Sequence, residues 1–167
     1  LGSNTLPKFS TINIHEVIEH TASLTEKETL DYIKIDRDYD PSIPEIKGDK
    51  GQLIQALLNI LRNAVQALKA STQEAPKIWI STRIERNFTV RSTSHRMVCC
   101  IKITDNGPGI PEKIFDRIFF PMVSGRPEGT GLGLSIAQSS IDIHRGLIKC
   151  ETSVDKTTFY VYLPLGE

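Results

Sequence analysis

The chain has 167 residues, of which 39% are apolar, enough to bury one core and so to form a single domain with a short tail. Its 20 Lys and Arg balance 20 Asp and Glu, which excludes the strong positive field of a protein that binds nucleic acid or an anionic membrane. The apolar runs are too short to cross a bilayer and no signal-peptide pattern is present, so we expect a cytoplasmic protein. The odd number of cysteines, Cys99, Cys100 and Cys150, predicts reduced packing residues.

The first predicted elements follow an aperiodic segment, residues 1–11, which we interpret as a linker or a cloning remnant. Apolar residues at helical spacing predict a short helix over residues 12–24, and alternation predicts a strand over 29–37. Asp49 is expected to cap a second helix that runs to about Leu68.

The rest of the chain is predicted to be mainly sheet. Residues 77–85 and 97–104 are rich in β-branched residues and predict strands, and the polar stretch 86–96 between them predicts a long hairpin loop. A third helix is expected over 134–145, where Gly146 ends it. The remaining strands are predicted at 147–151 and 158–163. Helices on one side of a mostly antiparallel sheet give an α+β sandwich.

The helix that follows Asp49 has two different faces. At about 100° per residue its apolar residues share one arc, and the opposite arc is polar. The polar arc comprises Gln52, Gln55, Asn59, Arg62, Asn63 and Gln66. Asn59 and Asn63 lie one turn apart, although Asn is a mediocre helix former, and their amide oxygens suit a Mg²⁺ that already carries phosphate oxygens. Alternatively, Asn59 and Asn63 are two solvated side chains without a metal. The helix alone favours this second interpretation, but the loops described next favour the Mg²⁺ site.

Two glycine-bearing loops indicate a nucleotide pocket. Asp105 ends a strand immediately before Asn-Gly-Pro-Gly, where a carboxylate can accept a hydrogen bond from the exocyclic amine of adenine, although these residues also form ordinary turns. Residues 129–133 run straight into a helix and present backbone N–H groups and the positive helix end to phosphates. No Lys-Ser or Lys-Thr follows these glycines, and the last Rossmann glycine is missing, so both of those phosphate loops are excluded.

Together these segments resemble the catalytic and ATP-binding domain of sensor histidine kinases, in the superfamily that includes gyrase, a heat-shock chaperone and MutL. Residues 57–64 resemble the N box of that family, 105–109 its G1 box, 119–122 its F box and 129–134 its G2 box. The likeness extends over about residues 12–165 and implies the Bergerat fold. In that fold three helices cover one face of a mixed sheet, and ATP lies between the helices and a mobile lid.

The resemblance also implies roles for individual residues. Asn63 corresponds to the main Mg²⁺ ligand and Asn59 to a second contact with metal or phosphate. Asp105 corresponds to the carboxylate that reads adenine, and Gly107 and Gly109 allow close approach. The phosphate cradle corresponds to Gly129, Gly131, Leu132, Gly133 and Leu134.

A basic residue at the end of the F box is typical of the family. Arg126 stands there, and either reaches the terminal phosphate when the lid closes or is a solvated loop arginine. The family's last box lacks its glycines here, so Thr157 or Thr158 is left to contact adenine through water. A second departure is Glu128 in place of the first glycine of the G2 box.

Phosphoryl transfer is favoured over hydrolysis. The superfamily's ATPases use a Glu one turn before the magnesium Asn, whereas this chain has Asn59, which cannot act as a base. His15 lacks the continuation of a phosphoacceptor motif and is expected to be a helix-surface residue. The expected acceptor is therefore a histidine on a dimerisation domain upstream, absent from this chain together with any sensor domain.

A narrower resemblance, to nitrogen-regulation sensor kinases of the NtrB type, rests on residues 120–126, 37–42 and 64–68. It implies a homodimeric kinase that phosphorylates an NtrC-type response regulator and is inhibited by the PII signal protein. The alternative, of another class, is a catalytically silent nucleotide-binding module that regulates or docks a partner. Glu128 and the altered last box favour that alternative, and Asn63, Asp105 and the glycine loop favour the kinase.

Overall fold

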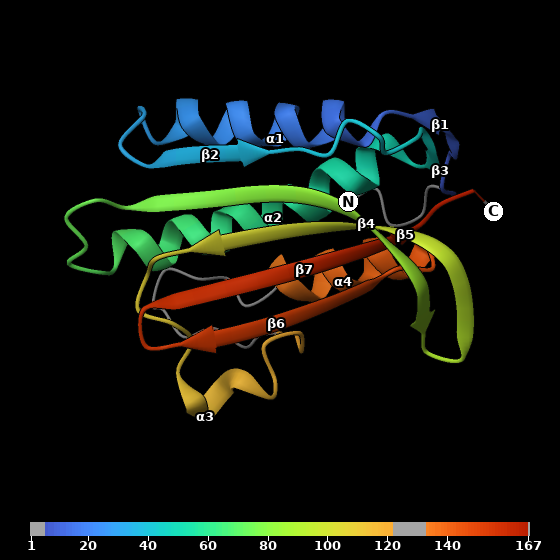
Figure 1. Cartoon of the computed structure of the whole chain (residues 1–167). Coiled ribbons are helices and arrows are strands. Elements are labelled where there is room, and N and C mark those ends of the chain that lie inside the picture. Colours follow the sequence, from blue (N-terminus) through green and yellow to red (C-terminus); the bar gives the residue numbers. More distant parts are fainter. Residues whose placement is uncertain (1–5, 122–132, 167) are drawn as a thin grey trace.

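The computed structural model describes residues 6–121 and 133–166 (Figure 1). Its elements in chain order are β1 (Ser10–Ile12), α1 (Ile14–Glu28), β2 (Lys34–Asp38), β3 (Ile46–Gly48), α2 (Lys50–Lys69), β4 (Lys77–Val90), β5 (Thr93–Asp105), α3 (Glu112–Phe115), α4 (Gly133–Ile143), β6 (Leu147–Ser153) and β7 (Lys156–Pro164). None of the described helices combines the length and the apolar character needed to span a bilayer.

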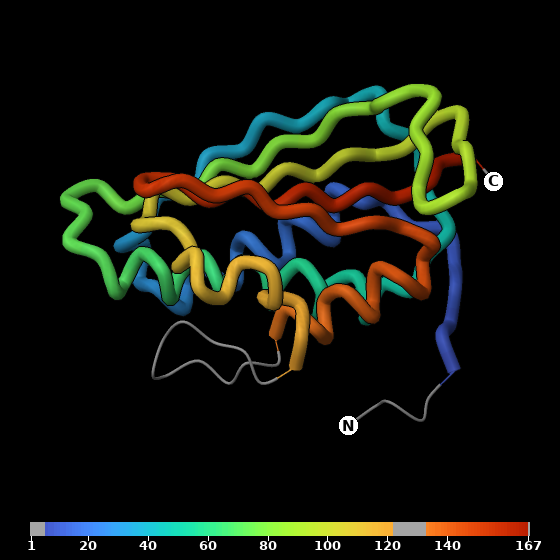
Figure 2. The backbone as a smooth tube through the Cα atoms, turned by 90° about the horizontal axis from the view of Figure 1, so that it is seen from below, coloured from blue at the N-terminus to red at the C-terminus, as the bar shows by residue number. Residues whose placement is uncertain are grey.

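A five-stranded sheet in the order β2-β4-β5-β7-β6 forms the centre of the fold. β2 and β4 are parallel and the other neighbours are antiparallel. Figure 2 shows α1, α2 and α4 together on one side of this sheet, with no described element over the other side. The predicted α+β sandwich, with a mixed, mostly antiparallel sheet and three helices on one face, is therefore confirmed.

The core lies between the sheet and these three helices. Alternate residues of the central strands point toward the helices because successive side chains of a strand face opposite ways. The apolar arc predicted for α2 is wholly buried, and it comprises Leu53, Leu57, Ile60, Leu61, Ala64 and Leu68. Burial of each of the larger side chains stabilises the fold by about 1.5–3 kcal/mol. The opposite arc of α2 remains exposed or half-buried, as expected.

The start of α2 is fixed by contacts from three parts of the chain. The Oδ1 atom of Asp49 accepts a hydrogen bond from the backbone N of Gln52 at 3.1 Å, so the predicted helix cap is confirmed. The Oδ2 atom of Asp49 accepts another from the backbone N of Lys8 at 2.9 Å. β1 pairs with β3 in a small antiparallel sheet, so the chain becomes ordered earlier than the periodicity indicates.

Two predicted boundaries are wrong. The strand expected over 29–37 is shorter, because α1 continues to Glu28 and Thr29 closes its end. The loop expected over 86–96 is mostly strand, since β4 and β5 stay paired until Val90 meets Thr93. This extension has contacts of its own: Phe88 stacks on Tyr162 with ring centroids 4.3 Å apart, and Arg91 forms a 2.5 Å ion pair with Asp142 of α4.

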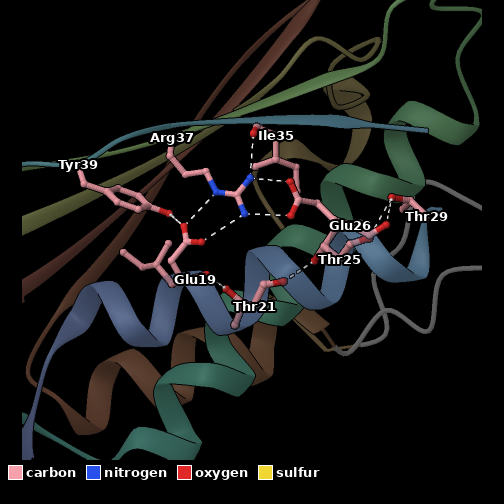
Figure 3. A network of polar contacts seen from close by, with 9 residues as sticks. Glu19, Thr21, Thr25, Glu26, Thr29, Ile35, Arg37 and Tyr39 are labelled. Carbon is pink, nitrogen blue, oxygen red and sulfur yellow. Dashed lines mark hydrogen bonds and ion pairs between the residues drawn. The ribbon is translucent and has the colours of Figure 1, made fainter. Parts of the chain in front are cut away.

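A network of charged residues joins β2 to α1 (Figure 3). The guanidinium of Arg37 forms ion pairs with Glu19 at 3.0 Å and with Glu26 at 2.5 Å. The hydroxyl of Tyr39 donates to Glu19 at 2.5 Å. The hydrogen bond to Glu26, which outweighs the opposing effect of burial, raises the pKa of Arg37, so its charge is permanent.

Candidate functional site

The two loops identified in the sequence lie at the two ends of one stripe of α2. A Cβ atom added to Gly107 would lie 3.3 Å from the Cβ of Ala67, and one added to Gly133 would lie 3.9 Å from the Cβ of Asn59. Asn59 and Ala67 are separated by about 12 Å along the helix axis at 1.5 Å per residue. Asn63 lies midway between them on the same stripe. α2 therefore separates the strand loop from the start of α4 by a fixed span.

Asp105 lies at one end of this stripe, where β5 ends. Its side chain is only 2% exposed, and its Oδ1 atom accepts a hydrogen bond from the backbone N of Gly107 at 2.9 Å. A Cβ on Gly107 would lie 2.9 Å from that oxygen, so a larger residue there would displace the carboxylate. The loop thus holds a buried acceptor in one orientation.

Asn106, next to it, has a structural role instead. Its Oδ1 atom accepts from the backbone N of Lys77 at 2.9 Å, and its Nδ2 atom donates to the carbonyl of Ala75 at 2.9 Å. The carbonyl of Asn106 accepts from Gln73 at 2.7 Å. The segment after β5 is therefore a turn as well as part of the candidate site, and its second residue attaches it to the start of β4.

The other side of the loop lies against the β6–β7 hairpin. Gly109 has a φ of +85°, and a Cβ there would lie 1.9 Å from the carbonyl oxygen of Ser153. The backbone N of Ile110 donates to the hydroxyl of Thr152 at 2.9 Å, and that hydroxyl lies 3.0 Å from the hydroxyl of Thr157. Thr157, which is buried, is the cross-strand partner of Asp105.

Thr152 is the residue that sequence reasoning missed at this end of the site. It connects the loop to the sheet, yet it resembles any β-branched residue of an edge strand. No local signal distinguishes it, because its partner Ile110 lies 42 residues away.

Asn59 and Asn63 lie on the stripe with partly exposed side chains. Neither carboxamide forms a hydrogen bond with another of the described residues, in contrast to that of Asn106, whose Oδ1 and Nδ2 atoms are both bonded. Two available amide oxygens one turn apart fit a Mg²⁺ whose other ligands are phosphate oxygens and water.

The start of α4 forms the far end of the site. α4 runs antiparallel to α2: Gly133 lies beside Asn59, and further along the hydroxyl of Ser140 donates to Gln52 at 2.8 Å. The positive end of the α4 dipole is therefore directed to the polar face of α2, where it favours an anion. Leu134 is half-buried and packs against the core.

His144 holds the other end of α4 in place. Its Nε2 atom accepts from the backbone N of Asp49 at 2.9 Å, and its Nδ1 atom lies 2.7 Å from the carbonyl of Ser140. The second contact requires a proton on Nδ1 and the first requires Nε2 to carry none, so the imidazole is neutral, and burial lowers its pKa. The ring of Phe9 stacks on it at 4.9 Å.

Several candidate residues lie outside the described residues. They are Arg126, Glu128, Gly129, Gly131 and Leu132. Phe119, the first residue of the F box, packs against the core, where its ring meets that of Phe159 edge to face with centroids 6.3 Å apart. Phe120, the next residue, is 58% exposed.

Two further expectations concern residues away from the nucleotide loops. His15, expected at the surface of α1, is instead half-buried: its Nε2 atom lies 2.9 Å from the hydroxyl of Thr82, and its ring stacks on Tyr39 at 4.9 Å. The three cysteines are free; Cys99 and Cys100 are buried and Cys150 packs against the core, as expected for packing residues. Burial raises the pKa of each thiol to about 12, which leaves them protonated and unreactive.

A pocket of about 350 Å³ lies on the uncovered side of the sheet. Its lining includes Trp79, Lys102 and Lys156, and contains none of the residues expected to bind nucleotide. We therefore place the candidate site on the helical side, where the loops and α2 meet.

Comparisons with known proteins agree with this geometry. The family model described as histidine kinase-, DNA gyrase B- and HSP90-like ATPase matches residues 48–167. The sensory histidine kinase/phosphatase NtrB of Vibrio alginolyticus is 47% identical over 99% of this chain and 47% of its own length. NtrB of Klebsiella oxytoca is 47% identical over 93% of this chain and 44% of its own length, so the chain spans just under half of these relatives.

A solved structure, the nucleotide-free catalytic domain of the histidine kinase ThkA, is similar over most of its length. It superposes with a TM-score of 0.74 at 27% identity, over 94% of this chain and 97% of that one.

Proposed function

Because this chain belongs to the family of histidine kinase-, DNA gyrase B- and HSP90-like ATPases, as an ATP-binding catalytic domain of the histidine kinase type, we propose that it transfers the γ-phosphoryl group of ATP to a histidine on a separate dimerisation domain. The observation that carries this proposal is the stripe of α2. Gly107, whose backbone N binds the buried carboxylate of Asp105, lies beside Ala67, and the start of α4 lies beside Asn59, about 12 Å away along the helix.

The end of the site at Asp105 binds the base. Its carboxylate accepts the 6-amino group of adenine, a donor that a 6-oxo base lacks. Gly107 and Gly109 let the backbone approach the ring, and Thr157, buried on the neighbouring strand, adds a contact to the base through water.

The other end of the site binds the phosphates. Asn63, with Asn59 as a second contact, holds Mg²⁺, which neutralises charge on the phosphates during transfer. The backbone N–H groups of Gly133 and Leu134 contribute to the phosphate cradle at the start of α4. Gly129, Gly131 and Leu132 complete the cradle, and Arg126 contacts the terminal phosphate.

The same residues disfavour hydrolysis. A carboxamide cannot take a proton from water, so Asn59 provides no general base for attack by water. The nucleophile is then an imidazole nitrogen supplied by the dimerisation domain, and the role of this chain is to position and polarise the phosphoryl group.

Nitrogen regulation is the setting that we propose. Relatives named sensory histidine kinase/phosphatase NtrB support this setting. In it, the full-length protein is a cytoplasmic homodimer that passes its phosphoryl group to an NtrC-type response regulator and responds to the PII signal protein. The chain itself holds only the catalytic part of this sequence of reactions.

Transfer in trans tests the proposal. The chain is incubated with labelled Mg-ATP and the histidine-bearing domain of the Vibrio alginolyticus relative, and acid-labile label on that domain is the expected result. Asn63→Ala should lower the rate about 100-fold, whereas Gln55→Ala, an exposed change one turn before Asn59 on α2, should leave it unchanged. Tight ATP binding without any transfer would instead favour the silent regulatory module, and label on the isolated chain would contradict an external acceptor.

A further inference from the structure

A row of three polar side chains crosses the sheet at the base end of the site. Thr152 of β6 is the cross-strand partner of Thr157 of β7, and Thr157 is the partner of Asp105 of β5. Directly opposed residues of neighbouring strands present their side chains on the same face of a sheet. The row therefore ends at the carboxylate to which the proposed function assigns the recognition of adenine.

Thr152 is the member of this row that holds the far end of the loop after Asp105. Its hydroxyl accepts the backbone N–H of Ile110 at 2.9 Å, and it lies 3.1 Å from where a Cβ on Gly109 would be. Because Gly109 leaves no room between the loop and the hairpin, the loop can rest on Thr152 only in this position. Loss of the hydroxyl would release Ile110 and, with it, the turn that aligns Asp105.

The hydroxyls of Thr152 and Thr157 are joined by a hydrogen bond. The two oxygens lie 3.0 Å apart, and either hydroxyl can donate to the other. The Thr152 oxygen already accepts from Ile110, which leaves it one lone pair and its own proton for this contact. Thr152 therefore restrains the hydroxyl of Thr157, the residue directly opposite Asp105 on the neighbouring strand.

We infer that Thr152 is a positioning residue for base recognition: it fixes the Asp105 loop through Ile110, restrains the hydroxyl of Thr157, and so sets the preference for a 6-amino purine over a 6-oxo purine. This inference rests on the proposed nucleotide site. Thr152 acts through these neighbours and does not itself contact the base.

Matched substitutions on the two faces of the hairpin test the inference. Thr152→Val removes the hydroxyl and keeps the shape, Thr152→Ser keeps the hydroxyl, and Thr158→Val is the control. Thr158, the alternative adenine contact in the sequence, lies on the opposite face of the sheet from Asp105, where it forms a hydroxyl pair with Thr104 at 3.0 Å.

Binding of Mg-ATP and Mg-ITP by calorimetry, directly and in competition, gives the readout. The two nucleotides differ at the 6-position, where ITP carries an oxo group. Thr152→Val should weaken Mg-ATP about tenfold and reduce the ATP-to-ITP affinity ratio by a similar factor, while inorganic tripolyphosphate binds as in the parent chain. Thr152→Ser should stay within about twofold of the parent, and Thr158→Val should keep the parental ratio.

An unchanged ATP-to-ITP ratio in folded Thr152→Val would overturn the inference while leaving the nucleotide site intact. An equal fall of the ratio in Thr158→Val would overturn it as well. If Thr152→Val does not fold, Thr152→Cys, which substitutes a weakly hydrogen-bonding thiol, decides between the same outcomes. A parent chain that binds neither nucleotide would overturn the proposed function together with this inference.

Discussion

Substitution of Gly109 by alanine should disturb the base end of the site more than any change of similar size. The φ of +85° costs an L-residue about 1–2 kcal/mol. The new Cβ would lie 1.9 Å from the carbonyl oxygen of Ser153, and restoring 3.0 Å requires a shift of about 1.1 Å. That shift also stretches the hydrogen bond from Ile110 to Thr152, which is worth about 0.5–1.5 kcal/mol.

The combined cost of Gly109→Ala is about 2–3 kcal/mol in the free energy of unfolding, or a fall in Tm of about 5–10 °C for a chain of this length. Because the loop moves, the Kd for Mg-ATP should also rise at least about tenfold. Thermal unfolding and calorimetric titration measure the two effects. Gly166→Ala is the control, since Gly166 has a φ of +73° but no atom within 4 Å of its added Cβ.

The reasoning is refuted if Gly109→Ala binds Mg-ATP like the parent and loses no more stability than Gly166→Ala. That result would mean that the loop can move away from the β6–β7 hairpin at little cost, and that the close approach of Gly109 to Ser153 does not fix its position.

Two further predictions concern the framework around the site. Arg37→Met leaves Glu19 and Glu26 without their half-buried partner and should lower the free energy of unfolding by about 2 kcal/mol. Arg83→Met, which removes an exposed ion pair with Asp38, should lower it by about 0.5 kcal/mol or less, and urea unfolding compares the two variants. Burial lowers the pKa of His144, so the contribution of this residue to stability is complete above about pH 6.5 and is lost as the pH falls below that value. The fall in Tm between pH 7.5 and pH 5.5 should therefore be smaller in His144→Gln than in the parent chain.

Controls distinguish these effects from general damage. Equal losses for Arg37→Met and Arg83→Met would contradict the network that joins β2 to α1. Burial also lowers the pKa of His15. The Tm of His144→Gln should therefore retain part of the parental dependence on pH. A variant with the full parental dependence would show that His144 does not carry the effect.

The parts of the fold that the sequence predicts are those set by local periodicity and local motifs. The cap at Asp49 and the apolar arc of α2 follow from spacing within one helix, and the structure confirms both. Four short boxes predict the Bergerat fold, and the similarity to the ThkA catalytic domain confirms it. The boxes also predict roles for Asn59 and Asp105, and in the structure Asn59 lies at one end of the stripe of α2 while the loop that follows Asp105 approaches Ala67 at the other end.

The parts that the sequence does not predict depend on distant contacts. Strands of three residues such as β1 and β3 are too short to show alternation, and they form because the segments from Lys8 and Asp49 meet across 41 positions. The polar stretch after residue 85 resembles a loop in the sequence because its apolar partner, Tyr162, lies on another strand. Thr152 escapes sequence reasoning for the same reason.

Calorimetric titration of Mg-ATP into the chain and into its Asp105→Asn variant tests the central claim most directly. The account predicts saturable binding by the parent, lost in the variant, because the single carbonyl oxygen of Asn would remain with the N–H of Gly107 and its NH2 group, a donor, would face the amino group of adenine. Binding of equal affinity in both chains, or none in the parent, would contradict the assignment of this loop and the stripe of α2 as a nucleotide site.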